Sequence, residues 1–270
     1  MNVKSSYPGK VILAAAGPGD PDLITVKALR YLQQADVVIT DRLVSEELLD
    51  KNLKPGAKLI YVGKQANKLA STPQEEINKL LVENAKLYLL VLRLKGGDIA
   101  FFSNVLDELR TLVREGISFE IVPGVTAASG ASAYAGIPLT ARGYATAVRF
   151  LTYTKAVAWD EKSWSELAST DDTLVFYMST ELLDTLVDKL LINHISLEKQ
   201  LAVIEQATTP FQHTHIFSLK EFKEKSKENQ FASPTVVIIG RVVALHHEFK
   251  WIENNLTEQN YFKPVSDFIE

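Results

Sequence analysis

The chain has 270 residues, of which 46% are apolar, and this is enough to bury the cores of two domains. Its 29 Lys and Arg residues against 33 Asp and Glu residues give a formal net charge of −4, which argues against a broad nucleic-acid-binding or anionic-membrane surface. Because the chain has no cysteine, disulfides, iron–sulfur clusters, thiolate zinc sites and cysteine nucleophiles are excluded.

The first half alternates between short apolar runs and amphipathic stretches. The run Val11–Ala16 is followed at once by the turn cluster Gly17–Asp20, so it is typical of a buried parallel strand and too short for a secretory leader. No apolar run reaches the roughly 18 residues that span a bilayer, and we expect a soluble, cytoplasmic protein. The further strands predicted in this half are Val37–Thr40, Lys58–Val62 and Leu87–Leu94.

Helix signals separate these strands. Asp20 before Pro21 predicts a helix start, because Asp caps free amides and proline suits the first turn. A capping box, Thr72-Pro73-Gln74-Glu75, predicts the next helix. The apolar stripes expected to face inward are Ile77, Leu80, Leu81 and Ala85 in that helix, and Val105, Leu109, Leu112 and Val113 in the one that ends near Gly116. This rhythm predicts an α/β domain with a mostly parallel sheet and helices on both faces.

The second half predicts a different sheet. Its last three strands are separated only by short connections or one polar helix, Leu219–Glu228, which indicates a mixed sheet with antiparallel pairs. We place an N-terminal α/β domain at 1–116, a C-terminal α/β domain at 117–245 and a peripheral tail at 246–270. The strands expected here are Ser118–Val122, Val148–Tyr153, Thr173–Met178, Leu201–Glu205, His213–Phe217 and Thr235–Ile239.

Four loops follow strands of this pattern, at the edge where ligands bind parallel sheets. They are Gly17–Pro21, Asp41-Arg42, Lys95–Asp98 and Pro123–Ser129. The first lacks the G-x-G-x-x-G spacing and its proline removes an amide, so dinucleotide binding is disfavoured. The run Gly96-Gly97-Asp98 fits a ligand loop that suits amino or ribose groups, and equally an ordinary turn in which Asp caps the next helix.

For several charged residues, an ordinary structural role is open as well as a functional one. Asp41 and Arg42 suit an ion pair or a helix cap, and Lys64 suits a solvated lysine. His213 and His215 share one strand face and form half of a metal site, but without a clear third ligand no metal site is predicted. The G-x-S-x-G elbow of many hydrolases is missing from the sequence.

An ordered set of motifs carries a family resemblance that extends from about Val11 to Leu245. Taken together, these motifs resemble those of the tetrapyrrole methyltransferase family. The matching runs are Ala16–Pro21, Asp41–Ser45, Tyr61–Lys64, Pro73–Asn78, Arg93–Asp98, Pro123–Arg142, Val148–Phe150, Phe176–Met178, Ala207–Gln212 and Ser233–Leu245.

The resemblance implies two α/β domains with S-adenosylmethionine in the cleft between them, in a homodimer. It implies C-methylation of uroporphyrinogen III at C-2 and C-7, which gives precorrin-2 and S-adenosylhomocysteine. A methylase of a later corrin precursor is the alternative enzyme. The residues that match the family's cofactor-binding positions are Pro18, Gly96, Gly97, Asp98, Phe101, Thr126, Ala127, Met178 and Ala207.

By the same resemblance, Asp41 and Lys64 match the family's proton acceptor and donor. A positioned base fits this chemistry, because a carbon-bound proton must leave as the macrocycle rearranges. The eight carboxylates of the substrate call for cations, and the candidates besides Lys64 are Arg42, Arg142 and Arg149. For Arg42 and Arg149, structural ion pairing is an equally open role.

Some positions depart from the family pattern. After Gly-Gly-Asp the family continues Pro-Phe-x-Phe-Gly-Arg-Gly, whereas this chain has the segment Ile99–Val105, in which Asn104 replaces an expected cation. Tyr153-Thr154, Ser179, Ala141 and Ala15 stand at other altered positions. These changes leave open a third role, a cofactor- or tetrapyrrole-binding protein with little activity.

Overall fold

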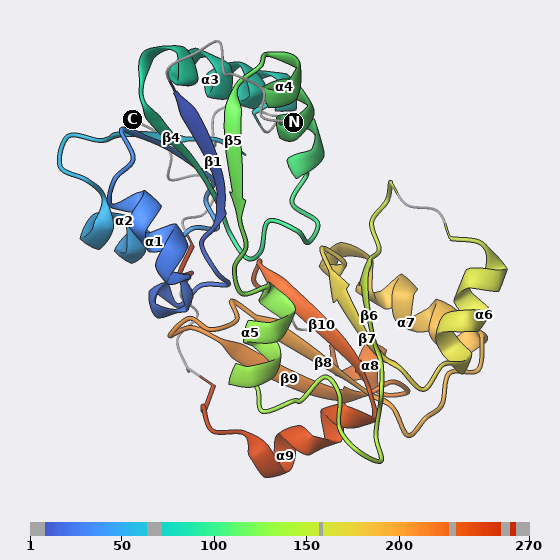
Figure 1. Ribbon diagram of the computed structural model, residues 1–270. Helices are drawn as coiled ribbons and strands as arrows, with labels where there is room; N and C mark the ends of the chain where they lie inside the picture. Colours follow the sequence, from blue (N-terminus) through green and yellow to red (C-terminus); the bar gives the residue numbers. More distant parts are fainter. Residues whose placement is uncertain (1–8, 64–71, 157–158, 227–230, 255–259, 263–270) are drawn as a thin grey trace. The chain divides into compact units, whose positions relative to one another are not determined.

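The computed structural model describes residues 9–63, 72–156, 159–226, 231–254 and 260–262 (Figure 1). The chain divides into two compact units, each with its own sheet. Unit 1 comprises Met1–Ala127 together with Asn260–Glu270, and unit 2 comprises Ala128–Gln259. Among the described helices, none is both long and apolar enough to cross a membrane.

Unit 1 is built on a five-stranded sheet of order β3-β2-β4-β1-β5, in which every pair is parallel. This confirms the parallel sheet predicted for the first half of the chain. The strands are β1 (Lys10–Ala15), β2 (Val37–Thr40), β3 (Lys58–Tyr61), β4 (Leu90–Lys95) and β5 (Ser118–Val122). The helices are α1 (Val26–Leu32), α2 (Glu46–Asn52), α3 (Gln74–Leu87) and α4 (Val105–Arg114).

The sheet of unit 1 is buried on both faces, because alternate residues of each strand point to opposite sides. Val11, Leu13 and Ala15 of β1 join a core cluster with residues of α3 and α4. Ile12 and Ala14 join a second cluster with residues of α1 and α2. All five side chains are fully buried. The continuous apolar character of this strand is therefore explained by helices on both faces.

The expected boundary at Gly116 differs from the structure, since the units divide after Ala127. Strand β5 belongs to the first sheet and pairs with β1 from Lys10↔Ser118 to Ala14↔Val122. Gly116 adopts φ +66° and makes the tight turn that returns the chain from α4 to this sheet. The apolar pattern of a strand does not identify the strand with which it pairs. The sequence prediction therefore places β5 in the wrong domain.

Two helix starts also differ from the sequence prediction. After Asp20 only a short 3-10 helix forms at Pro21–Leu23, and α1 begins later because the Thr25 hydroxyl accepts a hydrogen bond from the Ala28 amide. At α3, Thr72 makes no cap; its hydroxyl and amide instead donate to the Gly63 carbonyl.

The inward face of α4 is only partly as predicted. Leu112 is buried, but Val113 is 63% exposed and Glu108 is fully buried in its place. The prediction of Val113 as a core residue was therefore wrong. The reason is a pair of charged partners for Glu108 on β4, described below, which the apolar periodicity of the helix does not reveal.

Unit 2 contains a five-stranded sheet of order β6-β7-β10-β8-β9. β6 and β7 are parallel, while β10 pairs antiparallel with both β7 and β8, and β8 pairs antiparallel with β9. The predicted mixed sheet is confirmed. The strands are β6 (Val148–Thr152), β7 (Thr173–Tyr177), β8 (Gln200–Glu205), β9 (His213–Ser218) and β10 (Thr235–Gly240). The helices are α5 (Ala127–Tyr134), α6 (Glu161–Ser169), α7 (Leu183–Ile192), α8 (Phe222–Lys225) and α9 (His246–Phe249).

One face of this second sheet packs against α6 and α7. Phe176, Val203 and Val237 share a core cluster with Trp164 of α6 and Leu186 of α7. The predicted polar helix at 219–228 is shorter within the described residues, where α8 covers Phe222–Lys225. This packing fixes β7, β8 and β10 as the rigid centre of unit 2.

The residues after Leu245 are more closely packed than the expected peripheral tail. The Trp251 indole donates to the Ala133 carbonyl over 2.9 Å, and Nδ1 of His246 lies 2.6 Å from the Ala135 carbonyl oxygen. Further on, the Tyr261 hydroxyl lies 2.7 Å from the Ser45 hydroxyl, and Phe262 is 4% exposed. Burial raises the pKa of Tyr261, and these contacts make the described residues after Leu245 part of the folded structure.

Candidate functional site

Three of the expected loops are joined at the carboxyl edge of the first sheet. Gly17 and Gly97, which follow the neighbouring strands β1 and β4, exchange backbone hydrogen bonds of 3.1 and 2.6 Å. Oδ1 of Asp98 accepts hydrogen bonds of 3.3 Å from the amides of Gly124 and Ala100. The loop after β5 is thereby held against the loop after β4. Parallel strands place these ends side by side, which is why residues distant in sequence meet here.

Glycines allow the closest of these approaches. A Cβ on Gly96 would lie 2.8 Å from Cβ of Leu43, which belongs to the loop after β2, so the fourth loop also reaches this edge. Gly97 differs, because its φ is +70° and the atom nearest to an added Cβ would be the Ala127 nitrogen at 3.9 Å. An added Cβ at Gly97 would make only ordinary van der Waals contact, so the backbone there is less crowded than at Gly96, as a loop that lies against a ligand requires.

The remaining expected cofactor residues of unit 1 lie on the same loops. Pro18 is buried directly after Gly17, and Thr126 and Ala127 are half-buried after the Gly124 turn. Asp98 accepts from the Ala100 amide within its own turn and also ties a second loop in place, but the N-cap of α4 is Asn104. Its role in cofactor binding stays a prediction.

Asp41 follows β2 and is held on both sides of its carboxylate. Oδ1 accepts a hydrogen bond of 3.1 Å from the Leu43 amide, and Oδ2 lies 3.7 Å from Nη2 of Arg93. The side chain keeps 24% of its surface exposed. Among the described residues, Cβ of Asp41 is the atom that an added Cβ on Gly63, at the end of β3, would approach, at 4.0 Å. Asp41 is therefore an oriented, partly exposed carboxylate. Lys64 lies outside the described residues.

A buried charge network supports Asp41, and the sequence analysis missed it. Nε of Arg93 donates to Oε1 of Glu108 over 3.2 Å, and Nζ of Lys95 lies 3.2 Å from the same oxygen. Two carbonyl oxygens, of Ile39 and Leu94, accept from Nη1 of Arg93. Because these hydrogen bonds fix Nε and Nη1, Arg93 is a rigid support for Asp41.

The electrostatics of this network follow from burial. Desolvation lowers the pKa of Lys95, and the positive charge of Arg93 lowers it further, against the opposing attraction of Glu108. One signal in the sequence could have revealed the network. Arg93 and Lys95 alternate within a strand that is otherwise apolar and buried on both faces, and charges in such a strand require buried partners.

In unit 2, two expected cofactor residues also follow strands. Met178 comes directly after β7, adopts φ +55° and is 58% exposed. Ala207 is buried in the β8–β9 loop, between Gln206 and Thr208, which also have positive φ values of 45° and 70°. The altered position Ser179 has a structural role, because its hydroxyl donates to the Tyr177 carbonyl and accepts from the Tyr153 amide.

The three arginines expected to bind substrate have different surroundings. Nε of Arg149 donates to Asp172 over 2.6 Å, and this hydrogen bond lowers the pKa of Asp172. Arg149 also pairs in register with Leu174, near the start of β7, whereas Met178 follows the end of that strand. This geometry supports the structural alternative for Arg149. Arg142 is exposed in the loop after α5, and Arg42 is half-buried after β2.

The segment Ile99–Val105, which departs from the family pattern, has an unusual backbone. Phe102 and Asn104 adopt positive φ values of 50° and 53°, and Phe101 is half-buried. Ile99 is only 1% exposed, and its carbonyl accepts a hydrogen bond from the Ser103 hydroxyl. Non-glycine residues in the left-handed region are uncommon, so the segment has a specific conformation of its own.

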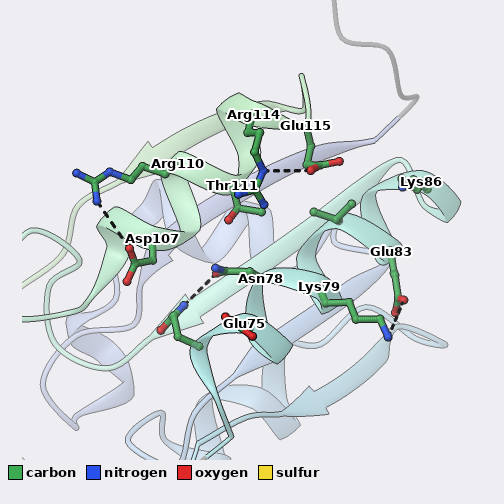
Figure 2. A pocket seen from close by; sticks show the side chains of 12 residues that line it. Glu75, Asn78, Lys79, Glu83, Lys86, Asp107, Arg110, Thr111, Arg114 and Glu115 are labelled. Atoms are coloured by element: carbon green, nitrogen blue, oxygen red, sulfur yellow. Dashed lines mark hydrogen bonds and ion pairs between the residues drawn. The ribbon is translucent and has the colours of Figure 1, made fainter.

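A hollow of about 730 Å³ lies over α3 and α4 (Figure 2). Four cationic and four anionic side chains line it, so its charges balance and offer no net attraction to a polyanion. Exposed neighbours pair with each other, as in Lys79–Glu83 and Arg114–Glu115. None of the four strand-end loops lines it, and we place the candidate site at the carboxyl edge of the sheet instead.

Comparison with known proteins identifies the family of the chain. The family described as Tetrapyrrole (Corrin/Porphyrin) Methylases matches residues 10–223. A siroheme synthase of Vesicomyosocius okutanii is 43% identical over 252 residues, which cover 93% of this chain and 54% of that protein. The chain thus spans about half the length of the curated relatives it matches.

Solved structures with the same fold include two methyltransferases. One is a cobalt precorrin-4 methyltransferase, with a TM-score of 0.76 and 29% identity, covering 87% of this chain and 95% of that one. The other is a uroporphyrin-III C-methyltransferase of Thermus thermophilus in complex with S-adenosylhomocysteine, with a TM-score of 0.72 and 35% identity, covering 87% and 93%.

Proposed function

From the premise that this chain belongs to the tetrapyrrole (corrin/porphyrin) methylase family, we propose that it methylates uroporphyrinogen III at C-2 and C-7 to give precorrin-2. The methyl donor is S-adenosylmethionine, and S-adenosylhomocysteine is the second product. The observation that carries the proposal is the convergence of four strand-end loops beside an oriented carboxylate, Asp41.

The loops of unit 1 suit the methyl donor chemically. Gly97 offers backbone that is less crowded than that of Gly96, and the carboxylate of Asp98 suits an amino group or ribose hydroxyls. When bound, S-adenosylmethionine supplies an electrophilic methyl group to an electron-rich pyrrole carbon. Orientation by these loops and exclusion of water account for much of the expected acceleration. Phe101, Met178 and Ala207 remain predicted contacts.

Asp41 is the proposed proton acceptor. Its two oxygens are held by the Leu43 amide and by Arg93, so the carboxylate needs no reorganisation to take a proton from the substrate. Lys64 remains the predicted donor. Arg42 and Arg142 are proposed to bind substrate carboxylates, whereas we assign Arg149 to its ion pair with Asp172.

A methylase of a later corrin precursor is the second candidate, favoured by the structural similarity to the cobalt precorrin-4 methyltransferase. The distinct conformation of Ile99–Val105 supports a third candidate, a binding protein with little activity. The homodimer implied by the resemblance also remains a prediction, which light scattering checks.

The decisive experiment supplies the chain with S-adenosylmethionine and enzymatically generated uroporphyrinogen III, and measures product masses. A product with two added methyl groups is expected. Product only from a later corrin precursor would support the second candidate. Tight binding of S-adenosylhomocysteine without product from either substrate would reject methyl transfer and support the binding protein.

A further inference from the structure

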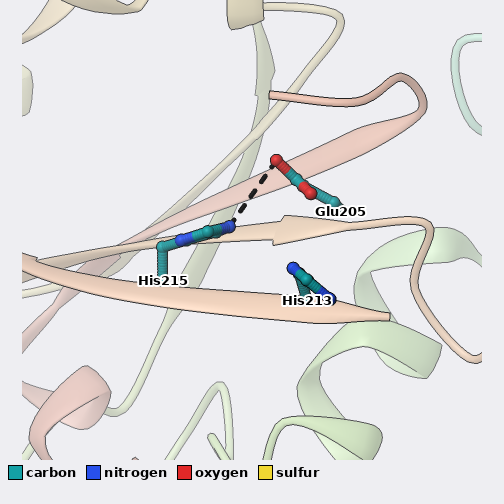
Figure 3. A group of neighbouring side chains, drawn as sticks. All are labelled: Glu205, His213 and His215. Carbon is teal, nitrogen blue, oxygen red and sulfur yellow. Dashed lines mark ion pairs between the residues drawn. The ribbon is translucent and has the colours of Figure 1, made fainter. Parts of the chain in front are cut away.

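Three side chains of metal-ligand type meet where the β8–β9 hairpin turns. Glu205 is the last residue of β8 and lies opposite His213, the first residue of β9. His215 lies opposite Val203, two positions further along β9, so its side chain is on the same face as that of His213. Figure 3 shows the three side chains on these two strands. Glu205 is the third side chain that the two histidines lacked in the sequence.

The ligand atoms of these residues form a compact triangle. One from each residue lies within 4.8 Å of the other two, and Nε2 of His215 is 3.6 Å from Oε1 of Glu205. Bonds of about 2.1 Å to a tetrahedral ion would place its ligand atoms about 3.4 Å apart. The longest separation between these ligand atoms therefore has to shorten by about 1 Å. Rotation of the side chains about their χ angles allows this change.

Burial leaves this group incompletely satisfied within the described part of the chain. Nε2 of His215 is buried and makes no hydrogen bond, although a buried ring nitrogen normally has a partner. Glu205 is only 8% exposed, and the one ion pair that it makes among the described residues is with His215. A cation between these atoms would satisfy both the nitrogen and the carboxylate.

The surroundings already orient two of the three ligands. The Ala232 amide donates to Oε1 of Glu205 over 3.1 Å, a contact of the kind that orients metal-binding carboxylates. The His215 ring stacks with Phe217 at an interplanar angle of 10° and meets Phe231 edge-on. These contacts restrict both side chains before an ion binds.

We propose that Glu205, His213 and His215 bind a divalent transition-metal ion of the zinc class. Two imidazoles and one carboxylate suit zinc and cobalt, whereas calcium and magnesium prefer oxygen ligands throughout. The ion would join the two ends of the loop 206–212, in which Gln206 and Thr208 have left-handed backbones. This proposal does not depend on methyl transfer.

The test is a titration of the full chain, stripped with a chelator, with Co²⁺ followed by Zn²⁺. Visible absorption of Co²⁺ reports nitrogen and oxygen coordination, and Zn²⁺ should displace it. The key variant is H213Q/H215Q. A matched control, H194N/H247Q, removes two exposed histidines that lie away from the cluster; asparagine suits His194 because φ is +61° there. E205Q is a third variant that keeps an oxygen for the Ala232 amide.

The wild type and H194N/H247Q should bind one Co²⁺ per chain. H213Q/H215Q should bind roughly 100-fold more weakly or worse, because even second-shell changes cost 10–100-fold in metal affinity. E205Q should also weaken Co²⁺ binding. If H213Q/H215Q does not fold, the Co²⁺ affinity of E205Q tests the proposal in its place. No saturable binding by the wild type, or undiminished binding by H213Q/H215Q and E205Q, would overturn the proposal.

Discussion

The two sheets present the ends of their strands in different ways. In unit 1 all five strands are parallel, so the loops after β1, β2, β4 and β5 leave from one edge and meet there. In unit 2 only β6 and β7 are parallel, and the antiparallel β8–β9 pair brings side chains of one hairpin together. The parallel sheet thus gathers backbone from distant segments, whereas the antiparallel hairpin gathers side chains from nearby ones.

Each unit also contains a buried carboxylate, on α4 in unit 1 and on β8 in unit 2, and the two have different partners. Glu108 of unit 1 is fully buried between Arg93 and Lys95. Glu205 of unit 2 has His215 at 3.6 Å and the Ala232 amide. A carboxylate with two cations supports the fold and the site beside it. A carboxylate beside two imidazoles is the set of ligands that we propose for a metal ion.

The largest expected effect is on turnover and concerns the strand ends of unit 1. Asp41→Asn should lower methyl transfer by about 10²–10⁴-fold, because the variant has no base. Its binding of S-adenosylhomocysteine should remain within about twofold, since the donor loops are unchanged. Single-turnover kinetics and calorimetry measure the two quantities.

The matched control for Asp41 is Asp36→Asn, at the other end of β2, where Asp36 pairs with Lys54 over 2.6 Å. That variant should keep its turnover per folded molecule. Equal turnover in Asp41→Asn and the wild type would remove Asp41 from the proton-accepting role.

The two buried carboxylates should differ in their contribution to stability. Glu108→Gln leaves buried Lys95 without its ion-pair partner and Arg93 with only Asp41, and should cost about 3–5 kcal/mol of unfolding free energy. Glu205→Gln in metal-free buffer should cost only about 1 kcal/mol, because it retains the hydrogen bond from Ala232. Hydrogen exchange of the β4 and β8 amides measures the two units separately. Similar losses of unfolding free energy in Glu108→Gln and Glu205→Gln would refute the contrast between the two carboxylates.

The effect of Gly97 on cofactor binding can be separated from the effect of its backbone strain. Gly97→Ala and Gly56→Ala both place a Cβ at positive φ, +70° and +81°, at a cost of about 1–2 kcal/mol each. Only Gly97 lies at the proposed cofactor site, so only Gly97→Ala should weaken S-adenosylhomocysteine binding, by roughly tenfold. Calorimetric titration compares them, and equal affinities would place the cofactor elsewhere.

The smallest expected effect is on acid stability. A hydrogen bond from Lys10, followed by those from Lys27 and Tyr31, lowers the pKa of Glu120 on β5 from 4.5 to about 2. The resulting stabilisation is complete above the unfolded pKa and is lost as the pH falls toward 2. Since these groups are partly exposed, it should amount to about 1 kcal/mol.

Urea unfolding of Glu120→Gln and the wild type from pH 7 to pH 2 checks this value. The difference should be constant down to about pH 5 and should vanish near pH 2. A difference that persists at pH 2 would show that the contribution is not electrostatic. The effect would then belong to packing of the side chain at the edge strand.

Most elements of the fold could be predicted from local patterns. Short apolar runs correctly identified β2 and β5, and the stripe Ile77, Leu81 and Ala85 is buried as expected. The sheet to which β5 belongs could not be predicted, because a strand's own sequence does not specify its neighbour. The burial of Glu108 instead of Val113 was missed for a related reason, since it depends on cations that β4 supplies.

The sequence by itself determined that parallel strands end in glycine-rich and acidic loops, because apolar runs and turn residues are local properties of the chain. Only the tertiary structure decided which of these groups meet. It joined Gly17 to Gly97, placed Arg93 between Asp41 and Glu108, and brought Glu205 to two histidines. Strand register and helix packing set these contacts, and both depend on residues far apart in the chain.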